Sequence, residues 1–324
     1  MRKLFSALIV GMAVGGLSSV AMAQTWDMPL PYPDTNFHTK NTRIFAEDVK
    51  KLTDGKLSIN IHSGASLFKM PEIKRAVRTS QAQLGEILLS AYGNENPVFE
   101  ADGIPFLAVG YDNAWKLYQA QKPVLEKLLA EEGLKLLYAS PWPGQDLFNQ
   151  TELKTLADMK GVKFRAYNAA TARLAELMGA VPTTVQYAEV PQAFSTGLVS
   201  SMLTSAATGV DVKAWEFLKV VYTTSAMHPK NAIFVNQKAF DGLAKPLQDA
   251  ILKAAADAEK RIWEASKVEA QATVKALGDN GMKVLAPSAG LQAELQKIGD
   301  TMVKEWVEKA GANGKTIVDS YNKM

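Results

Sequence analysis

The sequence predicts an α/β protein of two lobes with a ligand cleft between them. Two stretches, residues 24–91 and 159–205, each carry the order strand, helix, strand, helix, strand, which is typical of a parallel-rich sheet covered by helices. The break Pro141-Trp-Pro-Gly144 lies between them and indicates a crossover or hinge. Without the first 23 residues, about 300 remain, enough for two cores. Clefts between lobes are preferred ligand sites, and we expect hinge closure there.

The N-terminus reads as an export signal. Arg2 and Lys3 precede an almost uncharged apolar run, Leu4 to Val20, and Ala21-Met-Ala23 has the small residues of a cleavage site. A membrane anchor is the alternative, but the run is short, contains three glycines and is followed by no cationic flank. We therefore expect cleavage after about Ala23. The chain has no cysteine, which excludes a lipidated cysteine and disulfides and points to a bacterial periplasm.

The first stretch contains five elements in order. Residues 39–52 and 70–82 place apolar side chains at helical spacing and predict helices. Residues 25–30 and 56–62 predict strands, the latter through its alternation of apolar and polar residues. Residues 84–91 form a mostly apolar run that predicts a buried strand. Together they predict one parallel-rich sheet for the first lobe.

The other elements follow the same logic. Apolar periodicity over long, alanine- and lysine-rich stretches predicts helices, and short apolar runs predict strands. Outside the second β-α-β-α-β stretch, the predicted helices are residues 111–132, 243–278 and 290–310, and the predicted strands are 134–139, 232–236 and 283–286. We expect lobe I to comprise residues 24–142 and 233–270, and lobe II residues 143–232 and 271–324, joined by long connecting helices.

The feature that points to function is Arg165, which the pattern places on a strand facing the start of a helix. A guanidinium donates two parallel hydrogen bonds to a carboxylate. A helix start adds unpaired N–H groups and a partial positive charge. This arrangement predicts a protein that holds an acid rather than one that transforms it.

Reaction chemistry and polyanion binding find little support in the sequence. His38, His62 and His228 lack metal-site spacing, and no nucleophile elbow, phosphate-binding loop or dinucleotide fingerprint is present. A catalytic triad assembled across the fold stays open. The net charge of +3 includes Arg2 and Lys3, so it gives no argument for nucleic acid or membrane binding. The cluster Lys69, Lys74, Arg75 and Arg78 has helical spacing and predicts a solvated face.

Several motifs resemble one known family. Val-Lys-Phe-Arg165-x-x-Asn168 is followed by Leu-Met-Gly-Ala-Val-Pro182 and Tyr187-Ala-Glu-Val190, and Phe45-Ala-Glu-Asp-Val49 stands in the N-terminal half. This pattern is similar to the DctP-type extracytoplasmic solute-binding proteins of TRAP transporters, over nearly the whole chain. The resemblance implies a two-lobe periplasmic binding protein fold, an organic acid as ligand, the membrane subunits of a TRAP permease as partner, a monomer, and no enzyme activity, cofactor or metal.

The resemblance also implies site residues. Arg165 matches the arginine that binds the ligand carboxylate in that family, and Asn168 and Tyr187 match neighbouring site positions. Ser90 corresponds to a polar first-lobe position. With the aromatic and polar residues at element ends, the predicted ligand-binding set is Arg165, Asn168, Tyr187, Thr204, Ser205, Ser90, Tyr92, Tyr32, Gln145 and Trp142.

Departures from the family pattern narrow the ligand. The sequence reads Val199-Ser-Ser-Met-Leu-Thr204 where the family often has Val-Asp-Gly-x-x-Asn, and Gly144-Gln145 stands where sialic-acid binders have a second arginine. One carboxylate anchor among small hydroxyls, an amide and aromatics favours an apolar or aromatic monocarboxylate. A small hydroxy or dicarboxylic acid is the alternative. An exported enzyme acting on a carboxylate and an ABC-type binding protein stay open as other classes.

Overall fold

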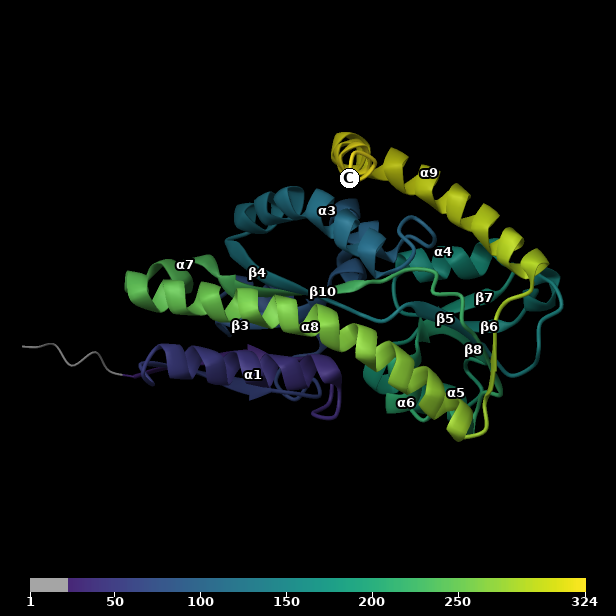
Figure 1. Cartoon of the computed structure of the whole chain (residues 1–324), viewed down its shortest axis with the longest axis horizontal. Coiled ribbons are helices and arrows are strands. Elements are labelled where there is room, and N and C mark those ends of the chain that lie inside the picture. Colours follow the sequence, from purple (N-terminus) through teal and green to yellow (C-terminus); the bar gives the residue numbers. More distant parts are fainter. Residues whose placement is uncertain (1–22) are drawn as a thin grey trace, which may run out of the picture.

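The molecule has two lobes, as the sequence predicts, and its strands form three sheets, two in the first lobe and one in the second. The structure is a computed structural model that describes residues 23–324; residues 1–22 of the predicted signal segment lie outside this range. Figure 1 shows one group of strands, with β3, β4 and β10, beside a second group that includes β5 to β8, with α8 running along both. The expected α/β architecture of two lobes is confirmed.

The first lobe is built on five strands. β1 (Gln24–Pro29) and β2 (Leu57–His62) pair in parallel, and a separate antiparallel sheet has the order β3 (Leu84–Leu88), β10 (Lys230–Asn236), β4 (Leu134–Pro141). The backbone N–H of Gln83 donates to the carbonyl of Asp27 at 3.1 Å, which links β1 to the start of β3. The prediction of one parallel-rich sheet is therefore wrong for β3. A strand from far along the chain inserts between β3 and β4, and local periodicity cannot reveal that partner.

Helices cover this lobe. They are α1 (Phe37–Leu52), α2 (Met70–Arg78) and α3 (Tyr111–Glu131), with the 3₁₀ helices η1 (Leu89–Tyr92) and η2 (Pro97–Gly103). The predicted strand 84–91 ends early because the chain turns into η1 at Leu89, and the predicted helix 70–82 ends at Arg78. The predicted solvated face is wrong for Lys74, which is buried and forms ion pairs with Glu95 and Glu132 at 2.6 and 2.7 Å.

The second lobe carries a six-stranded sheet in the order β11-β9-β5-β8-β6-β7. Its strands are β5 (Gln145–Asn149), β6 (Lys163–Ala166), β7 (Val181–Thr184), β8 (Ser201–Ser205), β9 (Val220–Tyr222) and β11 (Lys283–Leu285). β6 is parallel to β7 and β8, as expected for the predicted stretch, whereas β5 runs antiparallel to β8 and β9. The sequence pattern predicts neither β5 nor β9. Its helices are α4 (Ala169–Leu177), α5 (Val190–Ser195) and α6 (Ala206–Asp211), with the 3₁₀ helices η3 (Leu156–Met159), η4 (Tyr187–Glu189) and η5 (Ala214–Glu216).

Two long helices follow the short α7 (Gln237–Asp241). α8 (Lys245–Asp279) packs on α1 and β4 of the first lobe and on α6 of the second. α9 (Ala289–Tyr321) packs on α3 and η2, and it is longer than the predicted 290–310 because the chain resumes a helix after a kink at Gly311 (φ 56°, ψ −133°). The predicted lobe boundary between residues 232 and 233 falls inside β10, and the boundaries stay predictions.

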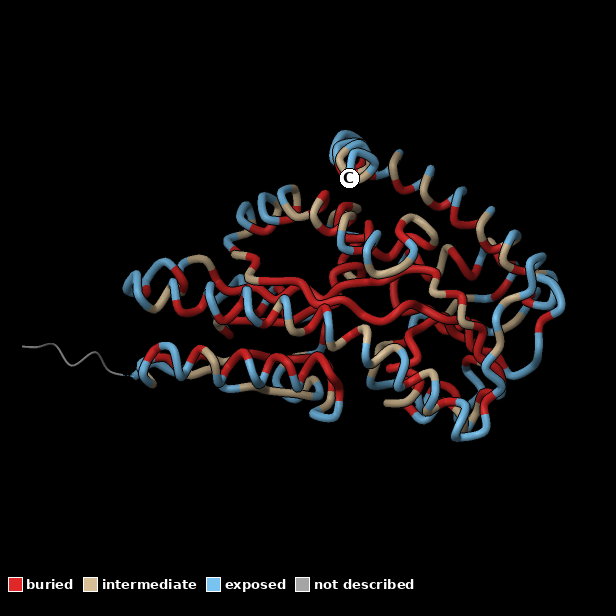
Figure 2. Tube along the Cα trace, viewed as in Figure 1, coloured by how far each residue is buried: buried red, intermediate tan, exposed pale blue. Residues whose placement is uncertain are grey.

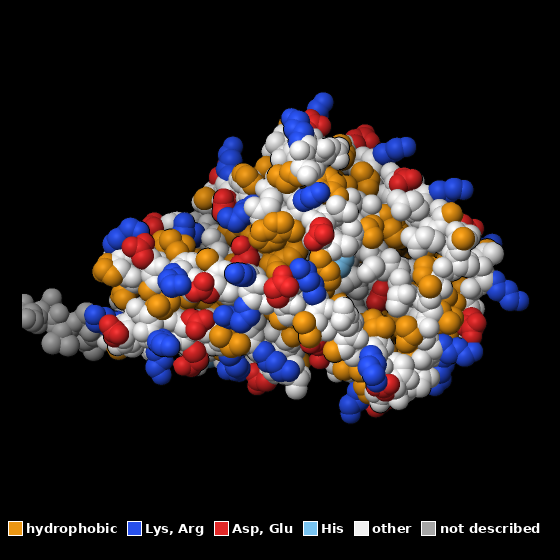
Figure 3. Space-filling view, viewed as in Figure 1, with side chains coloured by type: hydrophobic (Ala, Val, Ile, Leu, Met, Phe, Trp, Pro, Cys, Tyr) orange, Lys and Arg blue, Asp and Glu red, His pale blue; other side chains and the backbone are white. Residues whose placement is uncertain are grey.

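Burial follows the strands. Figure 2 shows the central strands of both lobes as a nearly continuous buried layer, with exposed positions on the outer helix faces. The edge strands β2, β7 and β11 are partly exposed. Figure 3 shows positive and negative side chains interspersed over the face that α1 and α8 form. Within residues 23–324, no helix has both the length and the apolar character needed to cross a bilayer.

Candidate functional site

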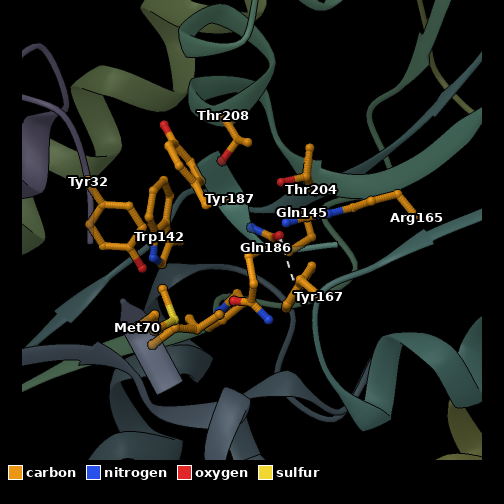
Figure 4. Close-up of a pocket in the computed structure, with 12 residues that line it drawn as sticks. Tyr32, Met70, Trp142, Gln145, Arg165, Tyr167, Gln186, Tyr187, Thr204 and Thr208 are labelled. Carbon is orange, nitrogen blue, oxygen red and sulfur yellow. Dashed lines mark hydrogen bonds between the residues drawn. The ribbon is translucent and has the colours of Figure 1, made fainter. Parts of the chain in front are cut away.

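A pocket lies where the two lobes meet. It comprises about 420 Å³ of space free of protein atoms, part of it open to solvent. Both lobes and the segments that join them supply its walls (Figure 4). The lining residues are Tyr32, Met70, Leu88, Trp142, Gln145, Arg165, Tyr167, Gln186, Tyr187, Thr204, Thr208 and Pro229.

Arg165 brings a buried positive charge into this pocket. It is the third residue of β6, its side chain is buried, and its Nε donates to the carbonyl of Val185 at 3.1 Å. The guanidinium also lies over the ring of Tyr167, 5.1 Å from its centre. None of the ion pairs formed among residues 23–324 includes Arg165. Figure 4 shows its nitrogen atoms directed toward Gln145 and Thr204, so the free donors face the pocket.

Electrostatics make this arginine a receptor for an anion. Burial lowers the pKa of Arg165 to about 10, and the nearby hydroxyls of Tyr167, Tyr187 and Tyr32 oppose the shift. The group therefore stays cationic at neutral pH. A buried cation without a partner is unfavourable, and an incoming carboxylate would supply both charge and two acceptor oxygens.

Aromatic rings form one wall. Tyr32 contacts Trp142 and Tyr187 edge to face, with centroids 5.1 Å apart in each pair. Tyr32 and Trp142 belong to the first lobe side and Tyr187 to the second, so this contact crosses the cleft. Such a wall accepts a flat or compact apolar body rather than a many-hydroxyl chain.

Amide and hydroxyl groups complete the pocket. The Nε2 of Gln145 donates to the carbonyl of Pro143 at 2.9 Å, and the Oε1 of Gln145 accepts from the hydroxyl of Tyr167 at 3.4 Å. Gln186 lies between this pocket and an open crevice lined by Tyr92 and Asn168. These groups can donate to and accept from a polar ligand atom.

Six of the ten predicted ligand-binding residues line the pocket. They are Tyr32, Trp142, Gln145, Arg165, Tyr187 and Thr204. The other four do not line it, and each has a structural partner. Ser205 caps α6 by accepting from the N–H of Thr208, and the hydroxyl of Tyr92 donates to the carbonyl of Met70. Asn168 caps α4 and donates to the hydroxyl of Ser90 at 2.9 Å.

Sequence reasoning missed the other lining residues, Met70, Leu88, Tyr167, Gln186, Thr208 and Pro229. Tyr167 and Gln186 directly adjoin predicted site positions, so their place in the motif was a usable signal. Met70 and Leu88 stand at the ends of a helix and a strand and carry no chemical signal of their own.

Hydrogen bonds across the cleft hold the lobes together. Asn36, which caps α1 of the first lobe, donates across the cleft to Asp211 of α6 at 2.8 Å. Tyr187, which belongs to the second lobe like Asp211, donates to the same carboxylate at 2.5 Å. Asn168 and Ser90 make the second link. The structure therefore has the lobes in contact around the pocket. Over residues 23–324, no three His, Asp or Glu side chains gather as a metal site requires.

The family model for bacterial extracellular solute-binding protein, family 7, named DctP, matches residues 32–310. The chain belongs to this family. It is thus a TRAP-type periplasmic solute-binding protein, which confirms the resemblance drawn from the motifs.

Relatives in this family span most of the chain. The C4-dicarboxylate-binding periplasmic protein DctP of Rhodobacter capsulatus is 25% identical over 86% of each chain. Two solved structures from Bordetella pertussis, the extracytoplasmic solute receptors DctP6 and DctP7 that bind pyroglutamic acid, are 50% and 45% identical, with TM-scores of 0.92 and 0.91. Each covers 93% of this chain and 100% of its own. A marine metagenome TRAP protein specific for pyroglutamate is 41% identical, with a TM-score of 0.91 over 94% of this chain and all of its own.

Proposed function

We propose that this protein is a periplasmic receptor that captures pyroglutamate, a compact lactam with one carboxylate, and delivers it to a TRAP permease. The observation that carries the proposal is the buried Arg165, which forms no ion pair with any of residues 23–324 and lies in a pocket at the lobe junction. The sequence identity of 41–50% between this chain and three receptors that bind pyroglutamate supports the choice of ligand.

The chemistry of the pocket fits this acid. The carboxylate pairs with Arg165, with about 1.5–3 kcal/mol expected for a charge-assisted hydrogen bond. The ring packs against the aromatic wall of Tyr32, Trp142 and Tyr187. The lactam N–H and C=O need an acceptor and a donor, which the amides of Gln145 and Gln186 both offer.

A dicarboxylic acid fits less well. Arg165 is the one cation among the twelve lining residues, so a second carboxylate would be desolvated without a charged partner. The proposed ligand is therefore a monocarboxylate, as expected from the sequence, but its ring carries a polar lactam in place of the expected apolar or aromatic body. We further propose that the protein is not an enzyme, acts as a monomer and loses its signal peptide after about Ala23.

Replacing Arg165 tests the proposal. We expect Arg165→Ala to weaken pyroglutamate binding about a hundredfold or more, because the buried carboxylate would lose the one cation among the lining residues. Isothermal titration calorimetry measures the affinity. The matched control is Arg173→Ala, since the Arg173 side chain is 43% exposed and pairs with Glu305 outside the pocket.

Two outcomes would contradict parts of the proposal. An unchanged affinity of Arg165→Ala would remove the arginine from the binding site. A wild-type protein that binds succinate or proline in preference to pyroglutamate, in a thermal-shift comparison of the three, would reject the ligand.

A further inference from the structure

Behind the aromatic wall lies a buried polar cluster that the binding pocket itself does not contain. Its centre is Asn231 on β10, which is fully buried. Asn231 stands opposite Leu88 of β3 and Ser140 of β4, so it lies on the middle strand of the three. Further along the same strand face are Ile233 and Val235, which pack in the core. An amide in this apolar row needs partners for its hydrogen bonds.

Both aromatic residues of the first lobe side donate to this one oxygen. The Nε1 of Trp142 lies 2.9 Å from Oδ1 of Asn231, and the hydroxyl of Tyr32 lies 3.1 Å from it. The indole N–H can only donate, so the oxygen of the amide must face the two rings. One acceptor thus fixes the position of two pocket walls.

The other end of the amide is held by a carboxylate. Nδ2 of Asn231 donates to Oε1 of Glu86 at 2.6 Å, and Thr42 of α1 donates to Oε2 at 3.0 Å. Because a carboxylate accepts, it selects the amide orientation that directs Oδ1 toward the rings. Glu86 is fully buried and forms no contact with the pocket.

We propose that Asn231, oriented by Glu86, is a positioning residue that sets Tyr32 and Trp142 for the ligand and, through the contact of Tyr32 with Tyr187, for closure of the lobes. The inference rests on the proposed function, because it takes the pocket around Arg165 as the ligand site. It extends that function to a cluster that touches no ligand.

The titratable groups that face Glu86 define what a pH experiment reads. They are His38 of α1, Tyr32 of the loop between β1 and α1, and Tyr138 of β4. Nδ1 of His38 lies 3.8 Å from Oε1 of Glu86. Burial lowers the pKa of His38, so its imidazole is neutral, and burial raises the pKa of both tyrosines. Burial raises the pKa of Glu86 to about 7. Of these four groups, Glu86 is therefore the one that gains or loses a proton near neutral pH.

Asn231→Asp is the decisive variant. It keeps the acceptor but places two carboxylates together, so they must share a proton. We expect pyroglutamate affinity about tenfold or more below wild type at about pH 8, with most of the loss recovered at about pH 5.5 in the same preparation. The ligand carboxylate is ionised at both values, since such groups have pKa values of about 3.5.

Exchanging the two roles supplies a rescue. In the double variant Glu86→Gln with Asn231→Asp, the new amide donates to the new carboxylate, and that carboxylate still accepts from the rings. We expect affinity within about threefold of wild type at about pH 8. The control is Asn236→Ala on the same strand, which removes the cap of α7 and should lower the melting temperature at unchanged affinity.

A second readout needs no ligand. The indole N–H resonance of Trp142, assigned with Trp142→Phe, should move with pH in Asn231→Asp and stay fixed in the double variant. Wild-type behaviour of Asn231→Asp in both readouts, or a double variant as weak as the single one, would overturn the inference. Failure of the proposed function would instead be seen in the wild-type protein, as an absence of pyroglutamate binding.

Discussion

Asp146 is a buried carboxyl at the junction of the lobes. It lies on β5, directly after the pocket residue Gln145, and accepts from the backbone N–H of Ser225 at 3.0 Å, on the segment that returns to the first lobe. Burial raises the pKa of Asp146 from 3.8 to about 7. A raised carboxyl pKa means that the folded protein favours the protonated form. Its contribution to stability is therefore full below about pH 4 and is lost as the pH rises through about 7.

We expect Asp146→Asn to remove this loss, because the amide keeps the acceptor and stays neutral. Between about pH 5 and pH 8, the free energy of unfolding of the variant should fall less than that of wild type, by on the order of 1–3 kcal/mol. Its melting temperature should therefore also fall less over this range. Glu86 titrates in both proteins, so the comparison isolates Asp146. Equal slopes of melting temperature against pH for the variant and wild type would show that ionising the Asp146 carboxyl costs little free energy in the folded protein.

Single residues differ in how far a sequence reveals them. Arg165 was predictable, because a cation in a strand-to-helix motif has a chemical meaning before any fold is known. Asn231 was not, since its importance comes from Glu86 and Trp142, which lie 145 and 89 positions away. A contact of that separation leaves no local pattern.

At the scale of elements, the start of α4 joins the two lobes. Asn168 accepts from the N–H of Thr171 at 2.8 Å as the helix cap, and its amide donates to Ser90 on η1 of the first lobe. One side chain thus stabilises a helix and the contact between lobes. The predicted role of Asn168 as a pocket residue differs from this position beside the pocket.

Two variants separate these roles. Asn168→Ser keeps a capping oxygen but is too short to reach Ser90, whereas Asn168→Ala removes both. We expect the alanine variant to lose about 1 kcal/mol more stability, as loss of a cap implies. Both should bind pyroglutamate several-fold more weakly, because a bond of about 1 kcal/mol would no longer favour the closed state. Unfolding curves and calorimetry measure the two effects, and wild-type affinity of the serine variant would show that the link is irrelevant to closure.

Elements were predicted well where periodicity is long and poorly where partners are distant. The helices α1, α3 and α8 follow apolar repeats of several turns, and their predicted bounds lie within two residues of the observed ones. β5 and β9 are short, and neither shows an alternation that separates it from a loop.

At the scale of the whole molecule, α8 packs on both lobes. Its 35 residues correspond to about 52 Å at 1.5 Å per residue. Its buried positions run from Ala250 to Ser266 over the first lobe and resume at Thr273 over the second. The turn and a half between them has no buried residue, and any hinge motion must be absorbed there or by sliding at one end.

A glycine in this stretch tests the idea. We expect Ala272→Gly and Ala256→Gly to lower stability equally, by about 1 kcal/mol, because both residues are exposed within the helix. Only Ala272→Gly should change pyroglutamate affinity, since Ala256 lies over the first lobe alone. Small-angle scattering with and without ligand would show whether the open state is more populated in that variant. Equal affinities of the two variants would indicate that the lobes move without bending α8.

The insertion of β10 between β3 and β4 also sets an order of events during export. A polypeptide that emerges from a translocation channel N-terminus first delivers β3 and β4 long before residue 230, and the whole stretch from β5 to β9 comes in between. Until β10 arrives, two strands present open edges, which invite pairing with other chains. The first lobe is begun early and completed late, so its newly emerged edges depend on rapid completion or on protection by a periplasmic chaperone.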